Sequence, residues 1–371
     1  MNNMYDFIVI GAGISACTFS SCLNKRFPDV SILLVEHGRR IGGRSTTRKS
    51  RENKILEFDH GLPSISFSKN VSQDILSLIS PLINSKKLFD ISNDILLMNE
   101  FGFLDNQFTN DTVFRSLPYM RNFCDEIINQ SVNPKRIHFL FKTFTKVIKL
   151  QNGLWKIEVN NGSLIKSKNL IVSSSLIAHP RCLKILNTNS LPLRDAFPLG
   201  KDKLVDSILK ETQRLTYLKR EVYILYVSNL VVVQNFNHKY LQIHFSNVVK
   251  EDLNFERIIF QRQTDGSMII VLHRSYENNI YEINIDNIIN SLLSLFVNYQ
   301  KFVDLFIQAR IIDKMNWRAS QPLNNLLPKE LQWSSTSKIG FCGDWFDLNC
   351  CGGVERSMNS SIRLANLLNL N

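Results

Sequence analysis

The stretch Phe7-Ile-Val-Ile-Gly-Ala-Gly-Ile-Ser-Ala16 decides the fold of the N-terminal part of this chain. Its first four residues are β-branched or aromatic, which is typical of a strand buried on both faces of a parallel sheet. A glycine-rich turn follows, and residues 17–27 then predict a helix that ends before Pro28. Residues 30–35 predict a second strand, directly before Glu36. The order of strand, glycine turn, helix and strand indicates a βαβ unit.

This βαβ unit carries the residue types that dinucleotide binding requires. Gly11 permits the tight turn, Gly13 lets the backbone approach a pyrophosphate, and the small Ala16 allows close packing of helix on strand. Glu36 lies where a carboxylate can accept hydrogen bonds from ribose hydroxyls, and its charge argues against the 2′-phosphate of NADP. The pattern by itself does not separate NAD from FAD. The expected cofactor contacts here are Gly11, Ala12, Gly13, Ile14, Ser15, Ala16 and Glu36.

The segment that follows Glu36 points to FAD. It reads His37-Gly-Arg-Arg-Ile-Gly-Gly-Arg-Ser-Thr-Thr47 and resembles the R-x-G-G-R-x-x-[ST] signature of amine-oxidase-like flavoproteins. Paired glycines can pass close to a cofactor, and arginine guanidinium groups can donate to phosphate oxygens. The resemblance implies FAD held non-covalently. The contacts expected in this segment are His37, Arg39, Arg40, Gly42, Gly43 and Arg44.

Three further segments resemble renalase-like members of the same group. They are Leu56-Glu-Phe-Asp-His-Gly61, Ser116-Leu-Pro-Tyr-Met120 and the W-R-x-x-Q-P stretch from Trp317 to Pro322. The resemblance implies that His60 and Gly61 lie near the flavin, His60 as an orienting or packed residue rather than a base. It covers residues 5–65, 116–180 and 314–368. The sequence departs from the pattern at Ala16, at Ser116 and at Leu62-Pro-Ser64.

The remaining expected cofactor contacts lie in an antiparallel meander and near the C-terminus. Strands over 142–150, 154–159 and 169–173 form this meander, and the resemblance implies contact with adenine near Phe141 and Val147. A buried strand then ends at Gly343-Asp344, and a helix begins near Gly353-Val354. In related flavoproteins the carboxylate corresponding to Asp344 would bind a ribityl hydroxyl. The positive end of the final helix would face the flavin.

These patterns predict an α/β protein with two domains. A Rossmann-like FAD-binding domain, a parallel sheet with the antiparallel meander, takes residues 1–65, 116–182 and 311–371. A mixed-sheet α+β substrate domain takes residues 66–115 and 183–310. In the latter we expect strands at 222–226, 230–233, 257–260 and 268–273 and an amphipathic helix at 288–302. His273 and Tyr276 are candidates to line the substrate space, although a lone histidine at a strand end is usually structural.

Composition narrows the partners. The 371 residues carry a formal charge of +11, but the lysines are scattered, which argues against a nucleic-acid partner. The sequence shows neither an apolar run of transmembrane length nor an N-terminal leader pattern. Seven cysteines without CxxC spacing, including the adjacent pair Cys350-Cys351, predict reduced thiols in the cytoplasm and no metal site. The oligomeric state stays open.

The sequence therefore predicts an FAD-dependent oxidoreductase of the amine-oxidase or renalase kind. Its small-molecule substrate would pass a hydride to flavin N5 from a C–N type or dihydronicotinamide-like carbon, with O2 as a candidate electron acceptor. No side chain is identified as catalytic. Two alternatives stay open at this point: a flavin- or nucleotide-binding protein without turnover, and an NAD-dependent dehydrogenase.

Overall fold

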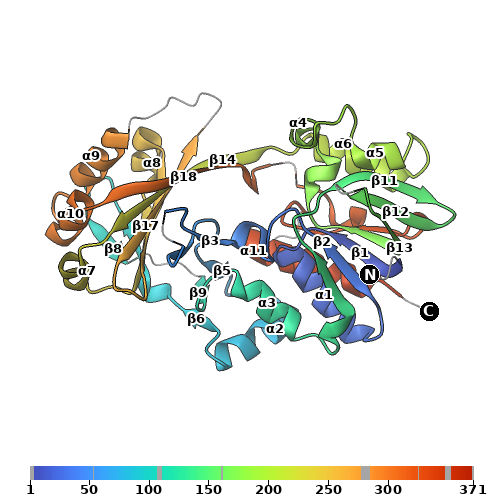
Figure 1. The fold of residues 1–371 in the computed structure, drawn as a ribbon, viewed down its shortest axis with the longest axis horizontal. Helices are drawn as coiled ribbons and strands as arrows, with labels where there is room; N and C mark the ends of the chain where they lie inside the picture. The colour runs from blue at the N-terminus through green and yellow to red at the C-terminus, as the bar shows by residue number, and fades with distance from the viewer. Residues whose placement is uncertain are drawn as a thin grey trace.

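The structure is a computed structural model that describes residues 4–52, 54–106, 111–159, 162–276, 285–324, 326–346 and 352–369. At residues 146, 147, 285 and 286 it describes the backbone alone. Figure 1 shows an elongated molecule with two lobes, and both chain ends lie in the same lobe. That lobe contains the N-terminal βαβ unit.

A mainly parallel sheet forms the centre of this lobe. The central strand β1 pairs in parallel with β2 on one side and with β13 on the other. The N-terminal half of β13 also carries the antiparallel meander, whereas its C-terminal half pairs with β20. The strands are β1 (Met4–Ile10), β2 (Ile32–Val35), β10 (Ile137–Leu140), β11 (Thr145–Gln151), β12 (Leu154–Val159), β13 (Leu164–Val172), β19 (Trp333–Ser334) and β20 (Ile339–Phe341).

Both faces of this sheet are covered, as its apolar strands predict. Phe7 and Val9 face one buried cluster, and their neighbours Ile8 and Ile10 face another, because side chains alternate along a strand. The first cluster is covered by α1 (Ile14–Arg26), α2 (Gln73–Asn84), α3 (Asn122–Asn129) and α11 (Gly353–Leu367). On the second face lie α4 (Arg181–Leu186), α5 (Pro192–Ala196) and α6 (Lys203–Gln213).

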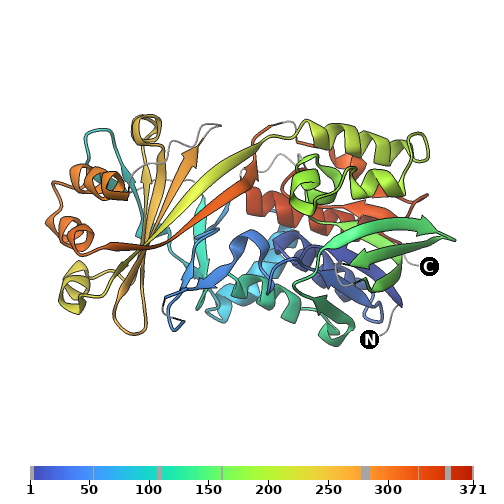
Figure 2. The same cartoon turned by 45° about the horizontal axis from the view of Figure 1, so that its top comes forward.

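The second lobe is built on a mixed sheet of order β18-β14-β17-β16-β15-β7-β8. Figure 2 shows the long strands β14 and β18 running from this lobe toward the first. Helices cover one face and enclose a phenylalanine-rich cluster. The strands are β7 (Ile95–Met98), β8 (Leu104–Asn106), β14 (Tyr217–Val227), β15 (Tyr240–Phe245), β16 (Phe255–Arg262), β17 (Met268–Tyr276) and β18 (Arg310–Pro322). The helices are α7 (Leu230–Phe236), α8 (Asn247–Leu253), α9 (Ile285–Leu295) and α10 (Gln300–Ile307).

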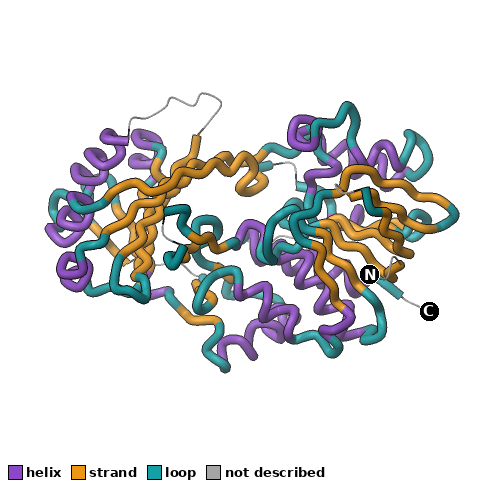
Figure 3. The backbone as a smooth tube through the Cα atoms, viewed as in Figure 1, coloured by secondary structure: helices purple, strands orange, loops and turns teal. Residues whose placement is uncertain are grey.

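Two small sheets lie between the lobes, as the tube in Figure 3 shows. One pairs β3 (Thr47–Lys49) with β4 (Glu57–Asp59), and the other joins β5 (Ile65–Phe67), β6 (Leu88–Asp90) and β9 (Thr112–Ser116). The apolar positions of α2 pack in the cluster around the N-terminal sheet, and those of α6 pack on its other face. Both segments thus share their core with that sheet, although the predicted division placed them in the substrate domain. The domain division itself stays a prediction.

The Rossmann-like fold class is confirmed, and several local predictions need correction. The expected strand at 230–233 is the helix α7, because Asn229 caps its N-terminus by accepting from the Val232 amide. The single helix predicted at 288–302 is divided into α9 and α10 by a turn near Val297. The first helix begins at Ile14 rather than at residue 17, directly after the glycine turn. Within the meander, β11 begins later and β13 begins earlier than expected.

Candidate functional site

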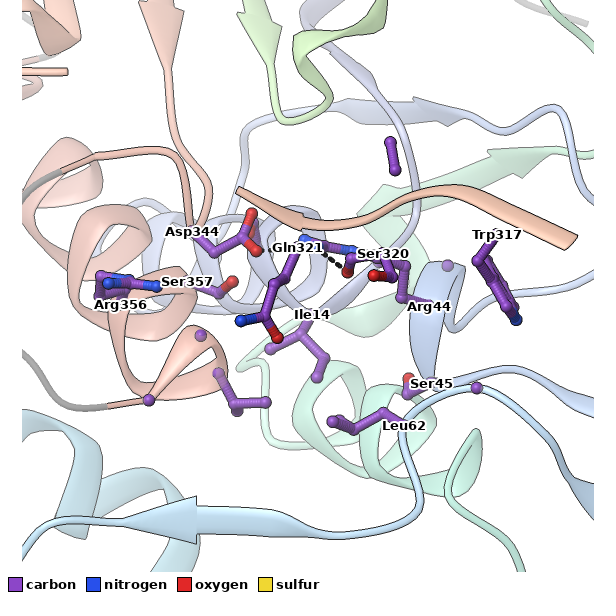
Figure 4. Close-up of a pocket in the computed structure, with 18 of the residues that line it drawn as sticks. Ile14, Arg44, Ser45, Leu62, Trp317, Ser320, Gln321, Asp344, Arg356 and Ser357 are labelled. Carbon is purple, nitrogen blue, oxygen red and sulfur yellow. Dashed lines mark hydrogen bonds and ion pairs between the residues drawn. The ribbon is translucent and has the colours of Figure 1, made fainter. Parts of the chain in front are cut away.

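A cavity of about 680 Å³ lies between the two lobes. This volume falls within the roughly 300–1,000 Å³ typical of ligand pockets. One end is formed by the glycine turn after β1, and the other by the open face of the second sheet. In Figure 4, β18 crosses the cavity and carries Trp317, Ser320 and Gln321. The cavity therefore joins elements from both lobes and from both ends of the chain.

Just over half of the expected cofactor residues line this cavity. They are Gly11, Gly13, Ile14, Ser15, Glu36, Gly42, Gly43, Arg44, Gly61, Asp344, Gly353 and Val354. The others do not line it: Ala12, Ala16, His37, Arg39, Arg40, His60, Phe141 and Gly343. Val147 lies in β11, but its side chain is outside the described part. Cofactor contact stays a prediction for all of these residues.

The glycine turn leaves open space where a phosphate group would approach. Gly11 has φ +110°, and a Cβ there would lie 2.6 Å from Ser173 Oγ, so both backbone and space require glycine. At Gly13 the nearest atoms to an added Cβ are Gly43 Cα at 3.7 Å and Gly42 O at 3.9 Å. The protein itself thus tolerates a small side chain at Gly13. The free space on this side belongs to the cavity and to the N-terminus of α1, which favours anions.

Glu36 fixes the shape of this turn. Its Oε2 accepts from the Ala12 amide at 2.8 Å, and its Oε1 accepts from the Gly38 amide at 2.6 Å. A carboxylate offers about four lone-pair sites, so acceptor capacity remains for hydroxyl groups in the cavity. The side chain thereby joins the turn after β1 to the loop after β2.

The Glu36→Ala substitution is expected to weaken the affinity for FAD about 10- to 100-fold, because hydrogen bonds to a charged acceptor contribute about 1.5–3 kcal/mol. Glu36→Gln keeps one oxygen acceptor and is the matched control with an intermediate loss. Dissociation constants from ultrafiltration, together with unfolding of the cofactor-free proteins, separate lost binding from a disordered turn. Unchanged retention in Glu36→Ala would show that this carboxylate does not contact the cofactor.

The arginine-rich loop also makes contacts within the protein. Arg44 Nη1 donates to Asp344 Oδ2 at 2.7 Å and to the Ser320 carbonyl at 2.8 Å (Figure 4). Arg40 lies 3.8 Å from Glu57 and is half exposed, outside the cavity. In this structure Arg44 therefore joins the N-terminal loop, the C-terminal Gly343-Asp344 turn and strand β18.

Two arginines that the sequence prediction overlooked line the cavity. Arg181, at the start of α4, has buried Nε and Nη1 atoms without a hydrogen-bond partner among the described residues, and it lies over the Tyr217 ring at 4.2 Å. Arg356, in the first turn of α11, also has a buried Nε without a partner in the described ranges. The only hint was the run Ser173-Ser-Ser175, which leads to Arg181 from the carboxyl end of a parallel strand.

The segment from β4 to Gly61 is an anchor for the site. Asp59 is buried and accepts from Thr47 Oγ1 at 2.6 Å, Arg115 Nη2 at 2.9 Å and the Met120 amide at 3.1 Å. Burial raises the pKa of this carboxyl, against the opposing effect of Arg115. The D-x-G turn is thereby fixed to the Ser116–Met120 segment.

Three histidines at the substrate side of the site are held neutral. Burial lowers the pKa of His60 to about 4 and that of His244 to about 3, and it lowers the pKa of His273 as well. The His60 ring stacks on Trp317 with centroids 5.7 Å apart. His273, which does line the cavity as expected, has Nε2 3.2 Å from the His60 carbonyl oxygen. Tyr276 is not among the lining residues.

The free energy of unfolding is expected to fall when the pH drops from about 6.5 toward 4. A histidine with a lowered folded pKa takes up its proton preferentially in the unfolded state, so its contribution to stability is complete above 6.5 and is lost below it. His244 alone should contribute about 2 kcal/mol of this loss at pH 5. Urea unfolding at several pH values measures how steeply the free energy of unfolding depends on pH. The His244→Gln variant should reduce this dependence, whereas His138→Gln, at an exposed position, should leave it unchanged. The same pH dependence in both variants would show that His244 is not responsible for the loss of stability.

Comparisons with known proteins agree with this arrangement. Residues 9–79 match the family model described as an NAD(P)-binding Rossmann-like domain. No curated protein matches the sequence. Similar solved structures include a conjugated-linoleic-acid-producing fatty acid isomerase from P. acnes (9% identity, 99% of both chains, TM-score 0.62) and a putrescine oxidase bound to putrescine (11%, 98% of both chains, 0.61). A third is a p-nitrophenol 4-monooxygenase from Pseudomonas putida (10%, 99% of this chain and 79% of that chain, 0.52).

The chain shares its fold with these solved structures, with a Rossmann-like domain at residues 9–79 and mixed α/β sheets. These identities are low, so the likeness defines the fold alone. Within the described ranges no helix is long and apolar enough to cross a membrane. The five described cysteines are unpaired, and Cys350-Cys351 lie outside the described residues.

Proposed function

We propose that this protein is an FAD-dependent oxidoreductase of the amine-oxidase or renalase kind. It holds FAD non-covalently in the cavity between the lobes and oxidises a small substrate at a C–N type or dihydronicotinamide-like carbon. The observation that carries the proposal is that the glycine turn at Gly11, Asp344 and the N-terminus of α11 line one cavity. Segments more than 300 residues apart thus meet around a space suited to one elongated ligand.

The residues present fit FAD. The open side of Gly13 and the N-terminus of α1 suit a pyrophosphate, and Arg181 and Arg356 add positive charge to the same lining. Glu36 suits the ribose hydroxyls. Gly353 and Val354 place the positive end of the 15-residue helix α11 at the cavity, where it stabilises negative charge. When bound, FAD would supply the atom that accepts the hydride.

The protein contributes position and surroundings rather than proton transfer. Trp317, Ser320 and Gln321 on β18 form a wall of the cavity. Burial lowers the pKa values of His60, His244 and His273, so these three rings are neutral at pH 7 and add no positive charge to the site. If the hydride leaves from a carbon of an already neutral amine or dihydropyridine, the reaction needs no base from the protein.

The visible spectrum of the purified protein is the direct test. We expect flavin absorption bands, and heat should release FAD into the supernatant, as expected for a non-covalent cofactor. Anaerobic addition of dihydronicotinamides and of amino-bearing donors should bleach the bands for at least one donor. Bound FAD that no donor reduces would favour a cofactor-binding protein without turnover. A colourless protein that binds NADH would favour an NAD-dependent dehydrogenase.

A further inference from the structure

One arginine of the second sheet lines the cavity but has no role in the proposed cofactor site. Arg257 lies in β16 and lines the cavity at the face opposite the glycine turn. Its Nε donates to His273 Nδ1 at 3.0 Å. Among the described residues no carboxylate forms an ion pair with its guanidinium group, and its two Nη atoms form no hydrogen bond. Arg257 thus has one donor fixed and its other donors available.

Neighbouring arginines of the same sheet are paired. Arg274 donates to Glu221 at 3.0 Å, and Arg220 forms an ion pair with Glu256. Burying an unpaired cation costs considerable free energy, so interior arginines usually have an acidic partner. Arg257 is partly buried at the cavity, and no described carboxylate forms an ion pair with it, so an anionic ligand at this end would meet an unpaired guanidinium group. Burial and the nearby Arg220 lower the pKa of Arg257 to about 10, which leaves it charged at neutral pH.

The groups around Arg257 favour an anion over a cation. His273 accepts from Arg257, so its neutral ring donates its other N–H to the His60 carbonyl. His244 also lines this end and is neutral, because burial lowers its pKa to about 3. Over the whole described lining, Arg44, Arg181, Arg220, Arg257 and Arg356 face only three carboxylates, from Glu36, Asp111 and Asp344. A positively charged amine at this end would meet the guanidinium group of Arg257, with which no described carboxylate forms an ion pair, whereas Arg220 already pairs with Glu256.

We infer that Arg257 binds an anionic oxygen group of the substrate, a carboxylate or a phosphate, at the end of the cavity opposite the nucleotide turn. The inference rests on the proposed function, because it places this anion in the cavity that would hold FAD. The substrate then carries its anionic group on β16 and presents its reactive carbon toward the centre of the cavity. Simple cationic amines are thereby disfavoured as substrates. Arg257 acts as a specificity residue.

Binding of small probes tests this inference without turnover. Benzoate and phenyl phosphate carry the two anion types, benzamide is a neutral analogue of benzoate, and benzylamine is a cation. Titration calorimetry and changes in the flavin spectrum report binding to the purified FAD-loaded protein. We expect at least one anion to bind and benzamide and benzylamine to bind at least tenfold more weakly, since a charge-assisted hydrogen bond contributes about 1.5–3 kcal/mol. Benzoate and phenyl phosphate distinguish the carboxylate from the phosphate.

Variants of Arg257 complete the test. Arg257→Met should weaken anion binding about 10- to 100-fold, and Arg257→Lys should restore part of it, because lysine keeps the charge but loses the planar fork. Arg310→Met is the control, since Arg310 is exposed on the same sheet and pairs with Glu52. All three variants should retain FAD like the wild type. Equal binding of benzoate, phenyl phosphate and benzamide, unchanged anion binding in Arg257→Met, or loss of FAD from Arg257→Met would each overturn the inference. A wild type without FAD would instead contradict the proposed function.

Discussion

The Gly13→Val protein is expected to fold and to purify without FAD. The backbone at Gly13 has φ −83° and ψ −174°, an extended conformation that valine adopts readily. Among the described residues, Gly43 Cα at 3.7 Å is the nearest atom to an added Cβ outside the chain neighbours of Gly13. The branched side chain would instead occupy cavity space at the N-terminus of α1, where the pyrophosphate is proposed to bind. Overpacking of this kind costs about 3 kcal/mol, which corresponds to a loss of affinity of more than about 100-fold.

Two companion variants make the Gly13 result interpretable. Gly13→Ala adds a single carbon and should weaken FAD binding less than valine does. Gly11→Ala should instead destabilise the protein, because its φ of +110° and the 2.6 Å approach to Ser173 Oγ leave no room for a side chain. Absorbance at flavin wavelengths per mole of protein measures occupancy, and urea unfolding measures stability. Wild-type occupancy in Gly13→Val would show that the cofactor does not approach this turn.

Gly61→Ala is expected to lower the free energy of unfolding by about 3 kcal/mol or more. A Cβ at Gly61 would lie 2.1 Å from the Arg44 carbonyl oxygen and 3.4 Å from Trp317 Cζ2. The same carbonyl accepts from the Leu62 amide at 2.9 Å, so the backbone cannot move away without losing that hydrogen bond. Because Arg44 also holds Asp344, the shift would reach the C-terminal side of the cavity.

Gly153→Ala serves as the control for Gly61. Gly153 lies in the turn between β11 and β12 with φ +72°, and nothing lies within 4 Å of an added Cβ. Alanine at this position should lower the free energy of unfolding by only about 1–2 kcal/mol, the strain of a left-handed backbone conformation. Urea unfolding of both proteins measures the difference. If Gly61→Ala were no less stable than Gly153→Ala, the close packing of Arg44 on Gly61 would be absent in solution.

Local sequence was sufficient for the elements that carry strong signals. The glycine turn, β1, β12 and the β20–Asp344 segment lie as their residues predict, because buried parallel strands and glycine turns need particular residue types. The prediction was wrong at Leu230-Val-Val-Val233, where β-branched residues favour a strand. The N-cap and tertiary packing instead favour the helix α7. Arg257 follows Glu256 directly in β16, and the sequence does not reveal that Glu256 pairs with Arg220 rather than with Arg257.

Sequence alone determined the Rossmann-like class and the nucleotide turn, because steric demands on glycine and on buried strands act within a few residues. Tertiary structure decided which side chains share the cavity. Arg44 turned out to be paired with Asp344, 300 positions away, whereas Arg181 and Arg257 face the cavity without an acidic partner among the described residues. Pairing of charges depends on distance in space, and no spacing along the chain encodes it. The proposed preference of the site for an anionic substrate therefore depends on how the two sheets are arranged in space.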